Sequence, residues 1–78
     1  MKFKVGDFVY FCGGDKLLQD YSVITNINDN SINSLVVEAL TEESKKYVGE
    51  TLNAHLDQVS LVTDKSIIDR LQKIMVFK

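Results

Sequence analysis

Residues 3–12 read Phe3-Lys4-Val5-Gly6-Asp7-Phe8-Val9-Tyr10-Phe11-Cys12, in which a short alternating segment meets a Gly-Asp pair and continues into five consecutive apolar residues. Gly6 adopts backbone angles that residues with a β-carbon resist, and the Asp7 side chain hydrogen-bonds nearby backbone amides. The pair therefore predicts a bend in the chain immediately before a strand. A strand so early in the sequence favours a mainly β fold.

Further strand patterns follow, separated by turn signals. Residues 13–16 predict a loop, and residues 20–28 predict a second strand because they are rich in β-branched residues. The Asn, Asp and Ser side chains of residues 28–31 predict a turn, because they compete for backbone hydrogen bonds. Later strands are expected at 34–41, at 47–56 with an interruption near Gly49, and at 59–62 after a tight turn at 56–58.

Residues 35–47 also fit a second interpretation, a helix. The residues at helical spacing are Leu35, Val36, Ala39, Leu40 and Tyr47, and good helix formers occupy 42–46. The strand interpretation is preferred, because residues 34–41 lie between two turn signals. It makes residues 42–46 a polar hairpin loop.

The end of the chain changes to a helical period. Apolar residues recur on one face at Ile67, Ile68, Leu71, Ile74 and Met75, and polar residues occupy the other face. Asp64 or Ser66 can cap the start, and Ser66 with Asp69 has the spacing of a capping box. We expect this amphipathic helix to pack across the open end of the sheet.

Size and composition limit the possible functions. With 78 residues the chain is expected to form one domain, whose small core leaves little room for a deep substrate cavity. Function is therefore expected on the exterior. The 45% hydrophobic and 26% charged residues are typical of a folded globular protein, and a net charge of −2 argues against a strong nonspecific grip on nucleic acid.

Cysteine usage and hydropathy predict the compartment. Cys12 is the single cysteine, so no intrachain disulfide is expected and the chain has the character of a reduced, intracellular protein. The N-terminus has no apolar signal core, and no window approaches the roughly 20 apolar residues of a membrane span. We expect a cytoplasmic protein that does not interact with membranes.

The strand pattern resembles the small SH3-like barrels, a group that includes Tudor-like and KOW-like modules. The residues that carry the resemblance are Val5-Gly6-Asp7, Val9, Ile24, Ile27 and Leu56-Asp57-Gln58-Val59 before Leu61 and Val62. The resemblance implies an SH3-like barrel of about five antiparallel strands in residues 1–62, with the helix of residues 63–78 packed on it in a single domain. The chain has Asn28-Asp29-Asn30 where a KOW module carries a glycine, and it lacks Trp and Pro.

Candidate catalytic and metal-binding residues are few. His55 is the only histidine and has no second histidine or cysteine near it in the sequence, which favours a hydrogen-bonded or solvent-facing strand residue. Cys12 has only Lys16 to activate it, which favours a half-buried structural thiol. The loop at 13–16 lacks the spacing of a phosphate-binding loop. We expect no enzyme activity, no cofactor, no metal and no small-molecule substrate.

Aromatic residues are the main candidates for binding. Because strand side chains alternate, Val9 and Phe11 are expected to fill the core while Phe8 and Tyr10 point outward. In one interpretation, the apolar face of the C-terminal helix covers Phe8 and Tyr10 with the side chains of Leu71, Ile74, Met75 and Phe77. The other leaves an exposed patch for a protein partner or a second copy of the chain, formed by Phe8, Tyr10, Tyr21 and Tyr47.

Two functions of different classes follow from these surfaces. The first is a small non-catalytic protein-interaction module, accessory or inhibitory, of the kind found in phages and other mobile elements. Six acidic residues against two lysines between residues 29 and 57 would steer it toward a basic partner. The alternative is a nucleic-acid-binding barrel with aromatic stacking and phosphate contacts from Lys16, Lys65, Arg70 and Lys73.

Overall fold

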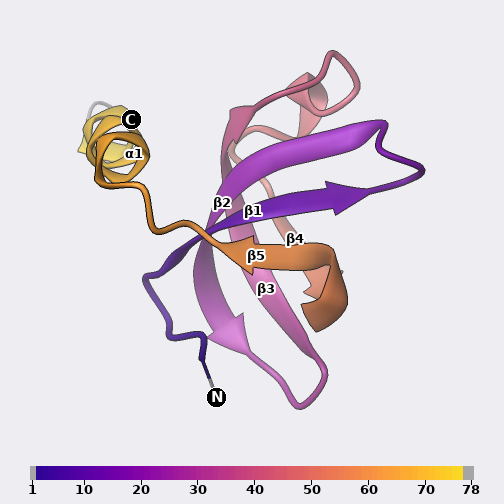
Figure 1. Cartoon of the computed structure of the whole chain (residues 1–78). Helices are drawn as coiled ribbons and strands as arrows, with labels where there is room; N and C mark the ends of the chain where they lie inside the picture. The colour runs from indigo at the N-terminus through magenta and orange to yellow at the C-terminus, as the bar shows by residue number, and fades with distance from the viewer. Residues whose placement is uncertain (1, 77–78) are drawn as a thin grey trace.

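The computed structural model describes residues 2–76 (Figure 1). The fold is mainly β with five antiparallel strands and a C-terminal helix, as the sequence predicts, and the strands form one open sheet. In chain order the elements are β1 (Phe8–Gly13), β2 (Leu18–Ile27), β3 (Ser31–Ala39), the 3-10 helix η1 (Lys45–Tyr47), β4 (Thr51–His55), the 3-10 helix η2 (Leu56–Gln58), β5 (Val59–Leu61) and α1 (Lys65–Val76).

The strand order is β4-β3-β2-β1-β5, so the first strand lies between β2 and the last strand. Val9 of β1 pairs with Ser22 of β2 on one side and with Leu61 of β5 on the other. The edges of the sheet are β4 and β5, and η2 connects them. In Figure 1 β5 lies beside β1 and crosses in front of β3, while α1 lies to the left of the sheet, away from β4.

Several boundaries differ from the sequence prediction. The strand β3 begins at Ser31 because the preceding reversal is tight, with the Asn28 backbone N–H donating to the Ser31 carbonyl at 2.8 Å. The helix considered for residues 35–47 is wrong, since residues 31–39 pair with β2 and β4 and only the short η1 is helical. The fourth strand begins at Thr51, after Gly49 turns the chain with a φ of +90°.

In the turn between β1 and β2, positive φ angles occur not only at a glycine but also at the two residues that follow the glycine pair. Gly14, Asp15 and Lys16 all have positive φ, and the Leu17 N–H donates to the Gly14 carbonyl at 3.0 Å. Two central residues with positive φ form the turn type whose twist matches that of a β-hairpin. This tight reversal allows β2 to begin at Leu18, earlier than residue 20.

The two faces of the sheet carry separate apolar clusters. Val9 is fully buried with Ile24 and Ile32 on one face, and Phe11 packs at the edge of this cluster. On the other face Phe8 packs with Leu71 of α1, whose exposed fraction is 0%. The alternation expected for β1 is therefore observed. Other members of the α1 stripe that join this cluster are Ile67, Ile68 and Ile74, while Phe77 lies outside the described residues.

Candidate functional site

A cavity of about 250 Å³ lies on the face of the sheet that carries the Val9 cluster. Its apolar walls come from five elements and include Phe11, Leu18, Val36, Leu52 and Tyr47 of η1. Its polar lining includes Asp20, Ser22 and Ser34. The interior was expected to be filled by side chains, and at this end of the sheet it is not, because small or polar residues occupy positions where a large apolar residue would close the space.

Three polar residues of this cavity are almost completely removed from solvent, whereas a fourth, Asn53, is exposed. The exposed fractions are 3% for Asp20, 1% for Ser22 and 4% for Ser34. Asp20 and Ser22 share a face because they lie two residues apart on β2, and Ser34, which pairs with Ile24 from β3, lies farther along the same face. The Ser22 hydroxyl donates to Asp20 Oδ1 at 2.7 Å. We call Asp20, Ser22 and Ser34 the polar floor.

Burial controls the electrostatics of the polar floor. Removal from water raises the pKa of Asp20 above its ordinary value of 3.8, and the hydrogen bond from Ser22 opposes this rise to a smaller extent. Among the described residues, Ser22 is the only side chain that donates a hydrogen bond to this carboxyl group. The cavity therefore contains an acidic group with little compensation from the protein.

Ser44 attaches the loop that carries Tyr47 to the sheet. Its hydroxyl is fully buried and accepts a 2.9 Å hydrogen bond from the backbone N–H of Gln19 in β2. Thr41 reinforces this contact, because its hydroxyl donates to the Leu17 carbonyl at 2.6 Å and accepts a 3.2 Å hydrogen bond from the Ser44 hydroxyl. The loop after β3 is thus attached to the start of β2, which positions η1 over the cavity.

The four aromatic residues proposed for binding do not form one patch. Tyr10 and Tyr21 lie together with ring centroids 6.0 Å apart, and Tyr10 donates a 2.9 Å hydrogen bond to Gln19 Oε1. Phe8 is buried beneath α1 and is therefore not part of an exposed patch. Tyr47 lines the cavity, on the opposite face from Tyr21.

The basic residues considered for nucleic acid are also dispersed. Lys16 lies in the β1–β2 turn, whereas Lys65, Arg70 and Lys73 lie on α1. The Arg70 guanidinium donates to Glu38 Oε1 at 2.8 Å and lies 5.9 Å from the Tyr21 ring centroid, so its charge is matched by a carboxylate. Asp69 follows Lys65 by one helical turn and precedes Lys73 by another. These residues form no continuous positive surface.

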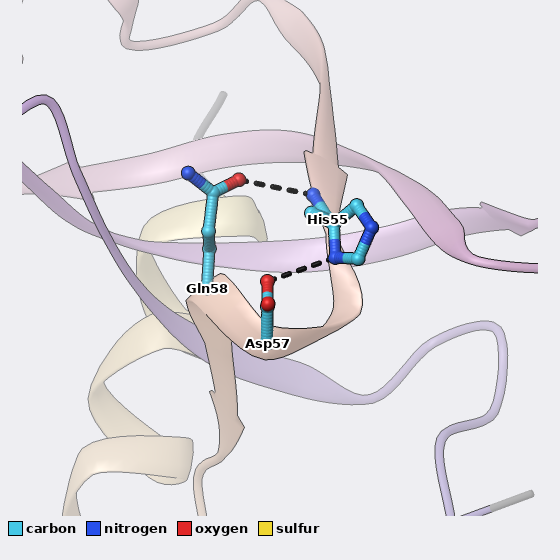
Figure 2. Close-up of polar contacts among 3 residues, drawn as sticks. All are labelled: His55, Asp57 and Gln58. Atoms are coloured by element: carbon cyan, nitrogen blue, oxygen red, sulfur yellow. Dashed lines mark hydrogen bonds and ion pairs between the residues drawn. The ribbon is translucent and has the colours of Figure 1, made fainter.

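His55 belongs to a local turn rather than to the cavity (Figure 2). Its Nδ1 lies 2.8 Å from Asp57 Oδ1, and its backbone N–H donates to Gln58 Oε1 at 3.1 Å. The side chains of His55 and Asp57 are 60% and 81% exposed. These contacts shape η2, which leads from β4 into β5. Cys12 is half-buried on β1 and does not line the cavity.

Within residues 2–76, no three His, Cys, Asp or Glu side chains gather as a metal site. The helices in this part of the chain are too short or too polar to cross a membrane. Comparison with known proteins gave no matching family model, no matching curated protein and no matching solved structure. The interpretation of the site therefore depends on its geometry.

Sequence reasoning did not identify the polar floor. A polar residue in a strand is usually assigned to the solvent-exposed side of the sheet. Asp20 is also the first residue of the strand expected at 20–28, where a polar residue is common. A signal is present in the alternation of β2, where Leu18, Asp20, Ser22 and Ile24 share one face. Because Ile24 belongs to the core, two polar residues in the same row indicate either a hydrogen-bonded core or a binding site.

Proposed function

We propose that this protein is a small non-catalytic protein-interaction module, and that its cavity accepts a side chain of the partner. The observation that carries the proposal is an opening with apolar walls and a buried polar floor. Binding sites combine apolar walls with a few polar groups that orient the ligand. A domain without catalytic machinery acts by occupying its partner, which is an accessory or inhibitory role.

The size of the cavity favours a single side chain as the occupant. About 250 Å³ is below the roughly 300–1,000 Å³ of pockets that enclose a drug-sized ligand. A side chain that protrudes from a protein surface needs less space, and the surrounding strands supply the rest of the contact area. The cavity thus suits an anchor residue of the kind that dominates protein interfaces.

The polar groups of the cavity favour binding over catalysis. Among the lining residues within 2–76, Asp20 is the only carboxylic acid, and none is a histidine or a cysteine. General acid–base catalysis works through groups placed to exchange protons with the reacting atoms, and it commonly uses a pair of them. One carboxyl group beside two hydroxyl groups provides hydrogen-bonding capacity for recognition instead.

We also propose that the sheet is an SH3-like barrel. Support comes from the position of β1 between β2 and β5, and from the 3-10 turn that leads into the last short strand. In such a barrel the two edges of a curved sheet approach each other, and side chains fill the space between them. The cavity would then be the incompletely filled end of the barrel.

The test compares capture of partners by two folded variants. Ser34→Leu directs an apolar side chain into the cavity, and Ser60→Leu places the same substitution at an exposed position of β5. Partners are captured from lysate on each variant and quantified by mass spectrometry, with folding checked by amide NMR spectra. We expect at least one saturable partner to be lost with Ser34→Leu and retained with Ser60→Leu.

Tyr47→Ala provides a second variant, which changes no residue of the buried core. Tyr47 is half-buried, so removing its ring widens the mouth of the cavity without leaving an enclosed void. The same partner should bind more weakly to this variant. If folded Ser34→Leu and Tyr47→Ala both retain every partner of the unmodified chain, the cavity is not the binding site.

A further inference from the structure

We infer that the side chain accepted by the cavity is a lysine, with its ammonium group bound by Asp20 and Ser22. This inference rests on the proposed function and specifies the chemistry of the partner. It depends on the geometry of the polar floor, on the number of hydrogen-bond acceptors that remain there and on the character of the walls.

The first step is the imbalance of charge at Asp20. Its side chain is 3% exposed, and its hydrogen bond from Ser22 comes from a neutral donor. A buried carboxylate is strongly disfavoured unless a cation or several donors compensate it. None of the described residues that line the cavity is basic. A cationic ligand would supply the missing compensation, whereas an anionic or purely apolar ligand would not.

The second step distinguishes an ammonium from a guanidinium group. Asp20 Oδ1 already accepts from Ser22, which leaves Oδ2 as the less engaged oxygen. A guanidinium binds a carboxylate best through two parallel hydrogen bonds to both oxygens. An ammonium has three donors in separate directions and can combine one carboxylate oxygen with a hydroxyl oxygen. Ser22 provides that hydroxyl oxygen, because its hydrogen is donated to Asp20 Oδ1 and its oxygen lone pairs remain as acceptors.

The third step concerns the walls. An unbranched chain of methylene groups leads to the lysine ammonium and needs an apolar channel, which Phe11, Leu18 and Leu52 supply. The Tyr47 ring already has an ammonium near it, because Lys46 Nζ lies 5.2 Å from its centroid. This contact shows that the wall residue tolerates a cation at its ring. In the adjoining loop, Lys45 is paired with Glu42 at 2.9 Å.

The test uses amino acid amides as probes and amide NMR shifts of the ¹⁵N-labelled full chain as the readout. The probes are the Nα-acetyl amides of lysine, arginine and norleucine, which differ in the end of the side chain. We expect saturable shifts at Ser22 and Ser34 with the lysine probe, and binding at least about tenfold weaker with norleucine, because norleucine lacks the charged donor. The arginine probe should bind less tightly than the lysine probe.

Two charge-neutralising substitutions complete the experiment. Asp20→Asn keeps the size of the side chain and should weaken binding of the lysine probe by about tenfold or more. Asp29→Asn removes the same charge at an exposed turn and should leave binding unchanged. Equal binding of lysine and norleucine would overturn the inference, as would unchanged lysine binding by folded Asp20→Asn. In either case the cavity could still select partners in the Ser34→Leu comparison, so failure of this inference is separable from failure of the proposed function.

Discussion

Ser22 Oγ donates a 2.7 Å hydrogen bond to Asp20 Oδ1, and both side chains point from β2 into the same cavity. Both residues are almost completely buried. Strand alternation explains their proximity, because residues two positions apart face the same side of a sheet. The pair connects the stability of the sheet to the chemistry of the cavity, since Ser22 satisfies part of the hydrogen-bonding capacity of the carboxyl group that is proposed to meet the partner.

Ser22→Ala should lower the free energy of unfolding by about 1.5–3 kcal/mol, the range for losing a hydrogen bond to a charged group. The substitution also removes the contact that lowers the pKa of Asp20, so this pKa should rise further. Urea unfolding measures the first effect, and NMR titration of the Asp20 carboxyl carbon measures the second. Ser60→Ala is the control and should change stability by less than about 0.5 kcal/mol. Equal stabilities of the two variants would contradict the prediction.

The raised pKa of Asp20 predicts a specific dependence of stability on pH. The folded chain binds this proton more tightly than the unfolded chain, so the contribution of Asp20 to the free energy of unfolding falls as pH rises from the ordinary value of 3.8 through the raised pKa. Asp20→Asn removes this contribution. Its stability relative to the unmodified chain should therefore increase with pH across that window and then level off.

Chemical unfolding of both chains between about pH 3 and 7 measures this difference, because that interval spans the ordinary pKa range of carboxyl groups. The difference between the two free energies of unfolding cancels the contributions of titratable groups that both chains share, including Asp64. Hydrogen bonds from Ser66 lower the pKa of Asp64, so its own contribution is lost as pH falls. A difference that does not vary with pH would mean that Asp20 has the same proton affinity in both states.

Leu71→Ala should destabilise the chain by about 2–5 kcal/mol, the usual range for truncating a buried leucine. Leu71 is fully buried among Phe8, Val23 and Val37, so its removal leaves a void between α1 and the sheet. Thermal unfolding followed by circular dichroism measures the loss. Val76→Ala is the matched control, because Val76 is 78% exposed and its truncation should be nearly neutral. Similar melting temperatures for the two variants would show that α1 does not depend on this contact.

Lys16→Gly should stabilise the chain by about 1 kcal/mol. Lys16 has a φ of 72°, a conformation that costs residues with a β-carbon about 1–2 kcal/mol and costs glycine little. Part of the gain is offset because glycine increases the entropy of the unfolded chain. Lys4→Gly serves as the control and should be destabilising, since Lys4 is not among the described residues with positive φ. Loss of stability with Lys16→Gly would contradict the prediction.

The sequence predicted those parts of the fold that follow from periodicity. Phe8 and Val9 face opposite sides of the sheet, as their alternation indicates, and the helical spacing of Ile67, Ile68 and Leu71 places them in one cluster with Phe8. The start of β3 was missed because polar Ser31 and Asn33 flank the single apolar residue Ile32, and their assignment to a strand depends on pairing with β2 and β4. Long-range pairing is invisible in a local pattern.

The candidate site was harder to predict, because it is a cavity, that is, a space that the surrounding side chains do not fill. Whether Asp20 faces solvent or a cavity depends on the sizes of side chains from neighbouring strands, including Ser34 and Ala54, and on the path of the loop that carries Tyr47. Ser44 sets that path through its contact with the Gln19 backbone, a connection across 25 positions of sequence. No spacing rule links such residues before the sheet is assembled.

The position of α1 has a practical consequence for handling the protein. Because α1 packs on the Phe8 face and the cavity opens on the Val9 face, residue 76 and the cavity mouth are separated by the thickness of the sheet. A surface-attachment tag or fluorophore joined after α1 would leave the cavity accessible. On the proposed function, a chain immobilised in this way would present the cavity to a partner in solution.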